Sequence, residues 1–123
     1  MSALAQVPAL VPELLRRRVE SQLDAFCLRQ RRRLACPQVR LQYAWENNGL
    51  QLMFRDGCNP PQPVARFTYS PELRQWSLLA PGLPQGWRLC MELPPTLNFE
   101  RLLAYLEEDP LNLFWPASFS CFS

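Results

Sequence analysis

The period of the apolar residues changes near Pro37, and this change constrains the fold more than any other feature of the sequence. Before it, in segment 12–33, apolar side chains recur at helical spacing. At about 100° per residue, four of them share one stripe: Leu15, Val19, Leu23 and Phe26. After it, from Val39, apolar and polar residues alternate, as in a strand with one buried face. We therefore expect a core-facing helix followed by a sheet.

The polar side of the expected helix is rich in charge. Five arginines lie away from the apolar stripe together with three acids: Arg17, Arg18, Arg29, Arg31 and Arg32, with Glu13, Glu20 and Asp24. Residues four apart are neighbours on a helix, so Glu13 can pair with Arg17, and Arg16 with Glu20. Pro12 suits the first helical position, where its missing N–H has no cost.

Two alternating segments, 39–46 and 50–55, flank Asn47-Asn48-Gly49 and predict a β-hairpin. With Asn48-Gly49 as a two-residue type I′ turn, Trp45 lies opposite Leu52 and Tyr43 opposite Phe54. The apolar faces of the two strands then coincide. The turn chemistry and the alternation thus agree on the same hairpin.

Further strands are expected at 64–69, 76–80 and 87–91, separated by turns rich in proline and glycine. Asn98 can cap a final helix, 99–108, that ends at Asp109-Pro110. Its apolar residues form one buried face: Phe99, Leu102, Leu103 and Leu106. The expected fold class is α+β, a mostly antiparallel sheet of four or five strands with both helices on one face. At 123 residues, a single domain with a C-terminal tail at 116–123 is expected.

Several residues occur in an order that resembles a bacterial family catalogued as domain of unknown function 3024. They are Phe26, a proline before the first strand, Val64-Ala65-Arg66-Phe67-Thr68-Tyr69, Trp76, Trp87, and Asp109-Pro110 through Phe114-Trp115. The resemblance covers about residues 14–115. The family's second-strand pattern, F-E-x-R-P, is matched by Leu52-Met53-Phe54-Arg55-Asp56, where Arg55 takes the arginine position and the glutamate and proline have no counterparts. The resemblance implies a fold and brings no established activity.

Because the chain has no His and no Lys, all 13 of its basic residues are arginines. This excludes imidazole-based triads, His-ligated metals, lysine Schiff bases and the P-loop lysine. No cofactor, no metal site and no catalytic residue is predicted. Five cysteines at irregular spacing, without a C-x-x-C pair, favour reduced thiols. With no secretory signal and no apolar run near the roughly 20 residues of a membrane span, a cytoplasmic protein is expected.

Charge is divided unevenly along the chain. Residues 1–36 carry seven Arg and three acids, a balance of +4, and residues 37–123 carry six Arg and eight acids, a balance of −2. The arginine-rich side of the first helix could meet phosphates, since guanidinium groups suit them. Alternatively, it is a solvated surface that Glu107-Glu108-Asp109 neutralise within the fold or across a homodimer.

Four further arginines fall on the polar phase of their expected strands: Arg40, Arg55, Arg66 and Arg88. If the strands form one sheet, these side chains share the face that the helices leave open, and we expect them to bind an acidic protein or a nucleic acid. Pairing with Glu46, Asp56 or Glu92 on a solvated surface is the alternative. The strand aromatics belong to the inward phase, so a stacking platform for single-stranded nucleic acid is missing.

Two other functions remain open at this stage. One is a small enzyme that uses a thiol or carboxylate of the 56–63 loop, with Cys58 beside Asp56, or Cys36, as the candidate nucleophile. The other is association through the apolar C-terminus. Phe114 and Trp115 are expected to complete the core, while Phe119 and Phe122 could form a partner or dimer surface.

Overall fold

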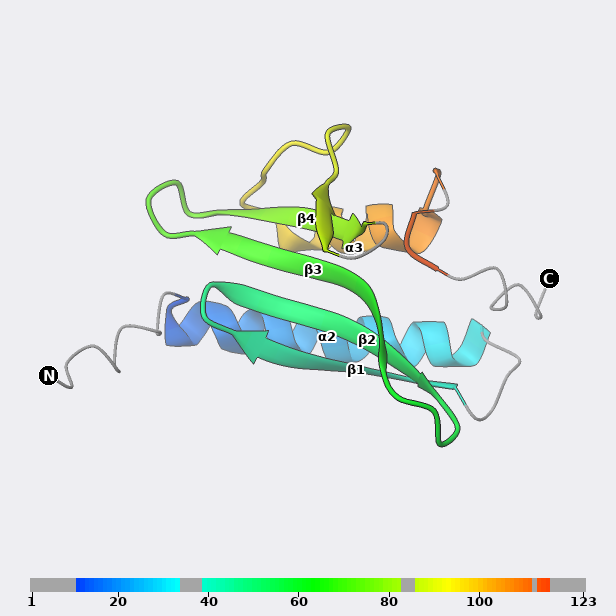
Figure 1. The fold of residues 1–123 in the computed structure, drawn as a ribbon. Helices are drawn as coiled ribbons and strands as arrows, with labels where there is room; N and C mark the ends of the chain where they lie inside the picture. Colours follow the sequence, from blue (N-terminus) through cyan, green and yellow to red (C-terminus); the bar gives the residue numbers. More distant parts are fainter. Residues whose placement is uncertain (1–10, 34–38, 83–85, 112, 116–123) are drawn as a thin grey trace, which may run out of the picture.

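The structure, a computed structural model, describes residues 11–33, 39–82, 86–111 and 113–115. Its elements are α2 (Glu13–Arg33), β1 (Val39–Glu46), β2 (Gly49–Asp56), β3 (Gln62–Ser70), β4 (Gln75–Pro81), β5 (Trp87–Leu89) and α3 (Phe99–Glu108). The strands form one antiparallel sheet in the order β1-β2-β3-β4-β5. Both helices lie on the same face of this sheet, α2 along β1 and α3 along β4 (Figure 1). The predicted α+β fold is therefore confirmed.

The core lies between the sheet and the two helices, and its members follow the predicted periods. From α2 and α3 come Val19, Leu23, Phe26, Phe99, Leu102, Leu103 and Leu106; from the strands come Leu50, Leu52, Phe54, Val64, Phe67, Tyr69, Trp76, Leu78 and Ala80. All of them are buried, so one apolar layer is shared by both helices. Burial of this layer is the main stabilising contribution to the fold.

Aromatic contacts join α3 to the middle of the sheet. The Phe99 ring lies 4.8 Å from that of Phe67 and 5.1 Å from that of Trp76, centroid to centroid. Trp76 in turn lies 5.0 Å from Tyr69. Tilted and edge-on ring pairs at these distances add to the free energy of area burial.

The hairpin between β1 and β2 forms, but its predicted turn and register are wrong. Glu46 pairs with Gly49, so the two-residue turn is Asn47-Asn48, and Trp45 lies opposite Leu50 rather than Leu52. A type I′ turn at Asn48-Gly49 would require a positive φ at Gly49, and Gly49 does not have one. The pairing shifts by two positions along β2, which leaves every side chain on its predicted face.

Gly49 is needed in the strand because the backbone of β3 approaches it closely. A Cβ atom on Gly49 would lie 1.9 Å from the carbonyl oxygen of Phe67 and 2.9 Å from the Cα atom of Thr68. Nearby, the Tyr69 N–H donates to the Asn48 carbonyl oxygen at 2.7 Å. Glycine is therefore required here by close packing of two strands rather than by turn geometry.

A Gly49→Ala substitution is expected to lower the free energy of unfolding by about 2–4 kcal/mol, because backbone atoms of β3 must move to admit the methyl group. Gln51→Ala, on the same strand and the same face, serves as control and should change it by less than about 0.5 kcal/mol. Urea denaturation measures both. Equal stabilities for the two variants would contradict the close approach of β3 to Gly49.

The chain after α3 is held by a single buried carboxylate. Asp109 ends the helix with a left-handed φ of 42°, and its side chain accepts hydrogen bonds from the N–H groups of Leu113 (2.7 Å), Phe114 (3.3 Å) and Trp115 (3.1 Å). The Trp115 indole donates to the Leu106 carbonyl oxygen at 2.9 Å. The predicted packing of Phe114 and Trp115 on the core is therefore confirmed, whereas Phe119 and Phe122 lie outside the described residues.

Asp109→Gly isolates the contribution of this carboxylate, because glycine accepts the left-handed backbone without strain. We expect the free energy of unfolding to fall by about 2–4 kcal/mol as three N–H groups lose a charged acceptor. The neighbouring Glu108 is exposed, and Glu108→Gln should change stability by less than about 0.5 kcal/mol. An Asp109→Gly protein as stable as the unmodified chain would show that the carboxylate does not hold this segment.

Candidate binding site

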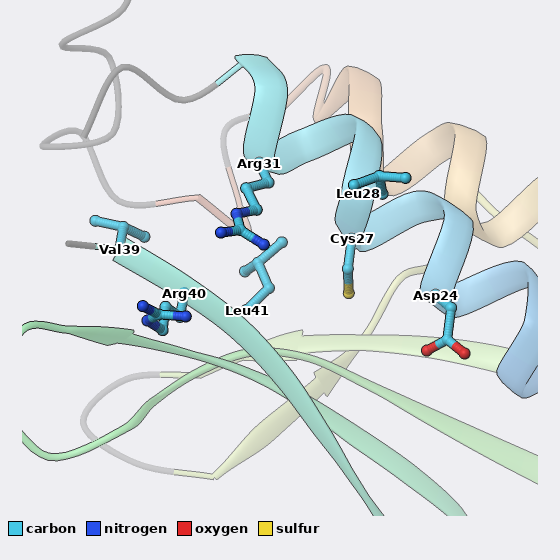
Figure 2. Close-up of a pocket in the computed structure, with 7 residues that line it drawn as sticks. All are labelled: Asp24, Cys27, Leu28, Arg31, Val39, Arg40 and Leu41. Carbon is cyan, nitrogen blue, oxygen red and sulfur yellow. The ribbon is translucent and has the colours of Figure 1, made fainter. Parts of the chain in front are cut away.

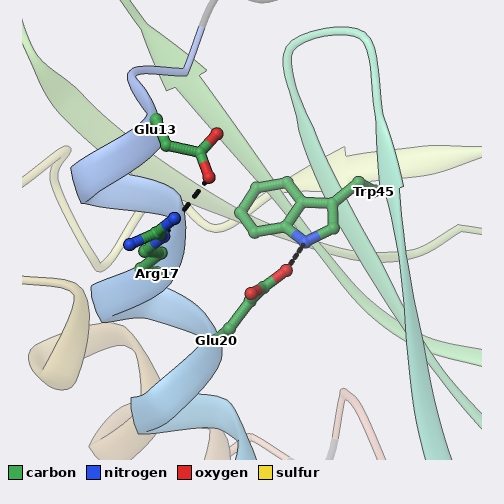
Figure 3. A network of polar contacts seen from close by, with 4 residues as sticks. All are labelled: Glu13, Arg17, Glu20 and Trp45. Atoms are coloured by element: carbon green, nitrogen blue, oxygen red, sulfur yellow. Dashed lines mark hydrogen bonds and ion pairs between the residues drawn. The ribbon is translucent and has the colours of Figure 1, made fainter.

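Two hydrogen bonds between side chains attach α2 to β1. The Trp45 indole N–H donates to Glu20 Oε2 at 2.6 Å, and the Tyr43 hydroxyl donates to Asp24 Oδ1 at 2.9 Å. Figure 3 shows Glu20 extending from the helix to the indole. Both acids lie off the buried stripe of α2, as predicted, and β1 lies beside the flank of the helix that carries them.

The arginines near the start of α2 are partly neutralised. Arg17 pairs with Glu13 at 3.3 Å, as predicted (Figure 3). Glu20 contacts Trp45 instead of its predicted partner Arg16, whose guanidinium lies over the Trp45 ring, 4.6 Å from its centroid. Arg16 therefore contributes to the packing of α2 on β1, and Arg17 contributes to the stability of the helix itself.

Further along α2, Arg29 pairs with Glu107 of α3 at 3.6 Å. This contact confirms part of the predicted neutralisation by the acidic end of the last helix. Arg18 and Arg31, in contrast, make no ion pair within the described part of the chain. Each of these two arginines lines a groove.

On the sheet, Arg40 and Arg55 share one face, as predicted, and the structure also makes them neighbours. They lie directly opposite each other in β1 and β2, both exposed, on the face that the helices leave open. Neither has an acidic partner among the described residues. Like charges at opposed positions repel and lower sheet stability, so this pair favours an anion between or above the two guanidinium groups.

Arg66 also lies on the open face, but its charge is used within the fold. Its Nη2 atom is 2.9 Å from Glu46 Oε1, and its guanidinium lies 5.9 Å from the centroid of the Trp87 ring. The ion pair with Glu46 was the predicted alternative to ligand binding. Arg66 is therefore less suited to a ligand than Arg40 and Arg55.

Arg88 does not share this face, and the prediction that it does is wrong. The predicted strand 87–91 ends at Leu89, and Arg88 pairs with Ala80, a buried residue of the helix-covered face. Trp87 and Leu89 occupy the outward positions instead. In so short a strand, alternation does not determine which side chains face the helices. That is determined by how β5 pairs with β4.

A groove runs between α2 and β1, and we call it the edge groove because β1 has a neighbouring strand on one side only in the described sheet. It has a volume of about 260 Å³ and is lined by Asp24, Cys27, Leu28, Arg31, Val39, Arg40 and Leu41. In Figure 2, Arg31 extends from α2 toward Leu41 on the strand. The groove thus combines apolar walls with two arginines, one from each element.

The sequence groups Arg31 with the helix arginines that could meet phosphates, but it does not place Arg31 beside Arg40. Its place on the polar side of α2 was predicted, but its proximity to Arg40 depends on β1 being the edge strand, which the sequence leaves open. A hint was available in Leu28, an apolar residue one turn before Arg31 that lies off the predicted buried stripe. Leu28 is half exposed in the structure and lines the edge groove.

Two titratable groups near this groove are shifted toward their protonated forms. Burial, followed by the charge of Asp24, raises the pKa of the Cys27 thiol to about 11. Burial also raises the pKa of Tyr43, and its hydrogen bond to Asp24 adds to this effect. Both groups are neutral at physiological pH, so the charges at the groove are those of Asp24 and the arginines.

Cys58, a candidate nucleophile of the enzymatic alternative, is exposed at the turn after β2 and does not line the edge groove; Cys36 lies outside the described residues. Cys27, Cys58 and Cys90 are free thiols. Within the described ranges, no group of three or more His, Cys, Asp or Glu side chains could hold a metal ion, and neither helix there is long and apolar enough to cross a membrane.

Comparison with known proteins gave one match. Residues 11–116 match the model of a family described as domain of unknown function, DUF3024. No curated protein and no solved structure matches the chain. The matched range includes both helices, all five strands and the edge groove.

The different environments of Cys27 and Cys58 predict different reactivities in the folded protein. At pH 8, iodoacetamide should modify the exposed Cys58 at least about tenfold faster than Cys27, because only a thiolate reacts and the raised pKa keeps Cys27 protonated. The reactivity of Cys27 should rise as the pH approaches 11. Peptide mass mapping measures both rates, and in urea they should become equal. Equal rates in the folded protein would contradict the burial of Cys27.

Proposed function

Because the chain belongs to the DUF3024 family, whose function is unknown, we propose a function from the site itself: a binding module that takes an acidic segment of a partner protein along the edge groove. The observation that carries this proposal is the arrangement of Arg31, Arg40 and Arg55. Arg31 and Arg40 line one groove, and Arg55 lies directly opposite Arg40. None of the three has an acidic partner in the described structure.

Carboxylates fit this arrangement for a physical reason. A guanidinium group presents paired N–H donors that match the two oxygens of a carboxylate, and it is more weakly hydrated than an ammonium group. An acid placed between Arg40 and Arg55 also removes their mutual repulsion. Asp24 lies at the groove as well, so the acidic side chains of the partner belong at the end formed by Arg31 and Arg40.

The edge strand gives the partner a backbone to pair with. Alternate residues of an edge strand direct their N–H and C=O groups away from the sheet, where an extended chain can bind them. Half-exposed Leu28 and partly buried Leu41 offer apolar contacts along the same path.

A nucleic acid is the less favoured ligand. Single strands are bound by exposed aromatic side chains, and most strand aromatics here face the helices: Tyr43, Trp45, Phe54, Phe67, Tyr69 and Trp76. Trp87 lies on the open face, but it is half-buried and contacts Arg66. A nucleic acid would therefore be bound through its phosphate groups alone, without stacking of its bases.

The proposal also places the protein in a bacterial cytoplasm. It further states that the chain itself has no enzymatic activity. The enzymatic alternative depends on Cys58, which would need an activating neighbour. Arg55 is close to it in sequence, but no contact between the two is recorded in the structure. The acidic partner consequently has more support than a substrate of the 56–63 loop.

The test uses a fluorescein-labelled, acetylated peptide of alternating glutamate and threonine, with fluorescence anisotropy as the measurement. Replacing Arg40 and Arg55 together by glutamine should weaken binding about tenfold at low salt, since each exposed ion pair contributes about 0.5–1 kcal/mol. Binding should also weaken as ionic strength rises. Arg101→Gln, on the exposed side of α3, is the matched control and should leave the affinity unchanged.

The ligand controls decide between classes. A peptide with glutamine in place of glutamate should not bind, and equal binding of the two peptides would overturn the role of the carboxylates. An oligonucleotide of matched charge should bind more weakly than the acidic peptide. If the oligonucleotide binds and the peptide does not, the protein is a nucleic-acid binder and the proposal is wrong.

A further inference from the structure

A second groove, separate from the edge groove, lies between the first half of α2 and the start of α3. It has a volume of about 270 Å³ and is lined by Leu15, Arg18, Val19, Gln22, Trp76, Leu97, Asn98 and Phe99. Polar and apolar atoms contribute equally to its wall. Its size suits a small molecule with a single ring rather than a macromolecule.

Two buried polar atoms at this groove have no hydrogen-bond partner in the described structure: the indole Nε1 of Trp76 and the side-chain Oε1 of Gln22. Trp76 is only 1% exposed. The indoles of Trp45 and Trp115, in contrast, donate to Glu20 and to the Leu106 carbonyl oxygen. Leaving a buried donor or acceptor unpaired costs about 1–3 kcal/mol, so a ligand that pairs with both atoms has a free-energy advantage.

Two positive groups lie at the same groove. Arg18 is exposed on α2 and makes no ion pair among the described residues. Asn98 is the N-cap of α3, and its side chain accepts from the Glu100 N–H at 3.1 Å, so the positive end of the helix dipole lies beside the groove. Both features favour a ligand with a negative charge.

We propose that this groove binds a small carboxylic acid with an aromatic body and a hydroxyl group. The carboxylate lies between the Arg18 guanidinium and the N-terminus of α3, while the ring packs on Leu15, Leu97 and Phe99. An acceptor atom of the ligand takes the Trp76 N–H, and its hydroxyl group donates to Gln22 Oε1. This site shares no residue with the edge groove, so it does not rest on the proposed function.

The probe for this site is para-hydroxyphenylacetate, and the measurement is the ¹⁵N–¹H NMR spectrum of the indole groups in the full chain. On titration, the Trp76 indole proton should move downfield as it gains a hydrogen bond. The indole signals of Trp45 and Trp115 should move little, because both already donate. No movement of the Trp76 signal at millimolar probe would overturn the proposal.

Variants and analogues test the anionic group. Arg18→Gln should weaken binding about tenfold through loss of a charge-assisted hydrogen bond, whereas Arg17→Gln, one residue along and paired with Glu13, should not. The neutral para-hydroxyphenylacetamide should bind more weakly than the acid by a similar factor. Equal affinity of acid and amide, or equal loss in both variants, would show that no specific carboxylate site exists.

Phenyl phosphate distinguishes two sources of the negative charge. Weaker binding than that of para-hydroxyphenylacetate supports a carboxylate ligand, and stronger binding would overturn that assignment. The acidic peptide of the previous section should leave the Trp76 indole signal in place. The failure of either proposal is therefore distinguishable from the failure of the other.

Discussion

The attachment of α2 to the edge strand is the interaction that determines where the candidate sites lie. Trp45 and Tyr43 each bury part of an aromatic ring under the helix and donate a hydrogen bond to a carboxylate on it, Glu20 at 2.6 Å and Asp24 at 2.9 Å. Hydrogen bonds to charged acceptors are stronger than those between neutral groups. Because these two lie one helical turn apart, they direct α2 along β1, and the edge groove is the space left between the two elements.

This attachment also explains which arginines remain available to a ligand. With the acidic flank of α2 turned toward β1, the helix arginines divide between those that stabilise the fold and those that do not. Arg16 lies over the Trp45 ring and Arg29 pairs with Glu107 of α3. Arg18 and Arg31 make no ion pair in the described structure, and they line different grooves. The chain thus has two candidate sites that carry positive charge, one at each half of α2.

Much of the fold could be predicted from the sequence, because periodicity reports which side chains face the core. The stripe of α2 and the Asn98 cap of α3 are where the spacing places them. What could not be predicted depends on contacts between segments distant in sequence. The Asn48-Gly49 pair predicts a turn glycine, whereas Gly49 is required because the β3 backbone approaches it closely. Alternation predicts Arg88 on the open face, whereas the pairing of β5 with β4 puts it on the helix-covered face. The edge groove could not be predicted, because the alternation of apolar and polar residues does not reveal the order of the strands in the sheet.

The most direct test of an acidic segment at the edge groove is amide hydrogen exchange of β1, measured residue by residue by NMR with and without the glutamate–threonine peptide. If the peptide adds to the sheet, alternate amides of β1 (Val39–Glu46) gain an acceptor, and their exchange should slow at least about tenfold. The amides of β5, at the other edge of the described sheet, should exchange as before. Unchanged exchange in β1 while the peptide is bound, or slowing at β5 instead, would contradict the binding mode.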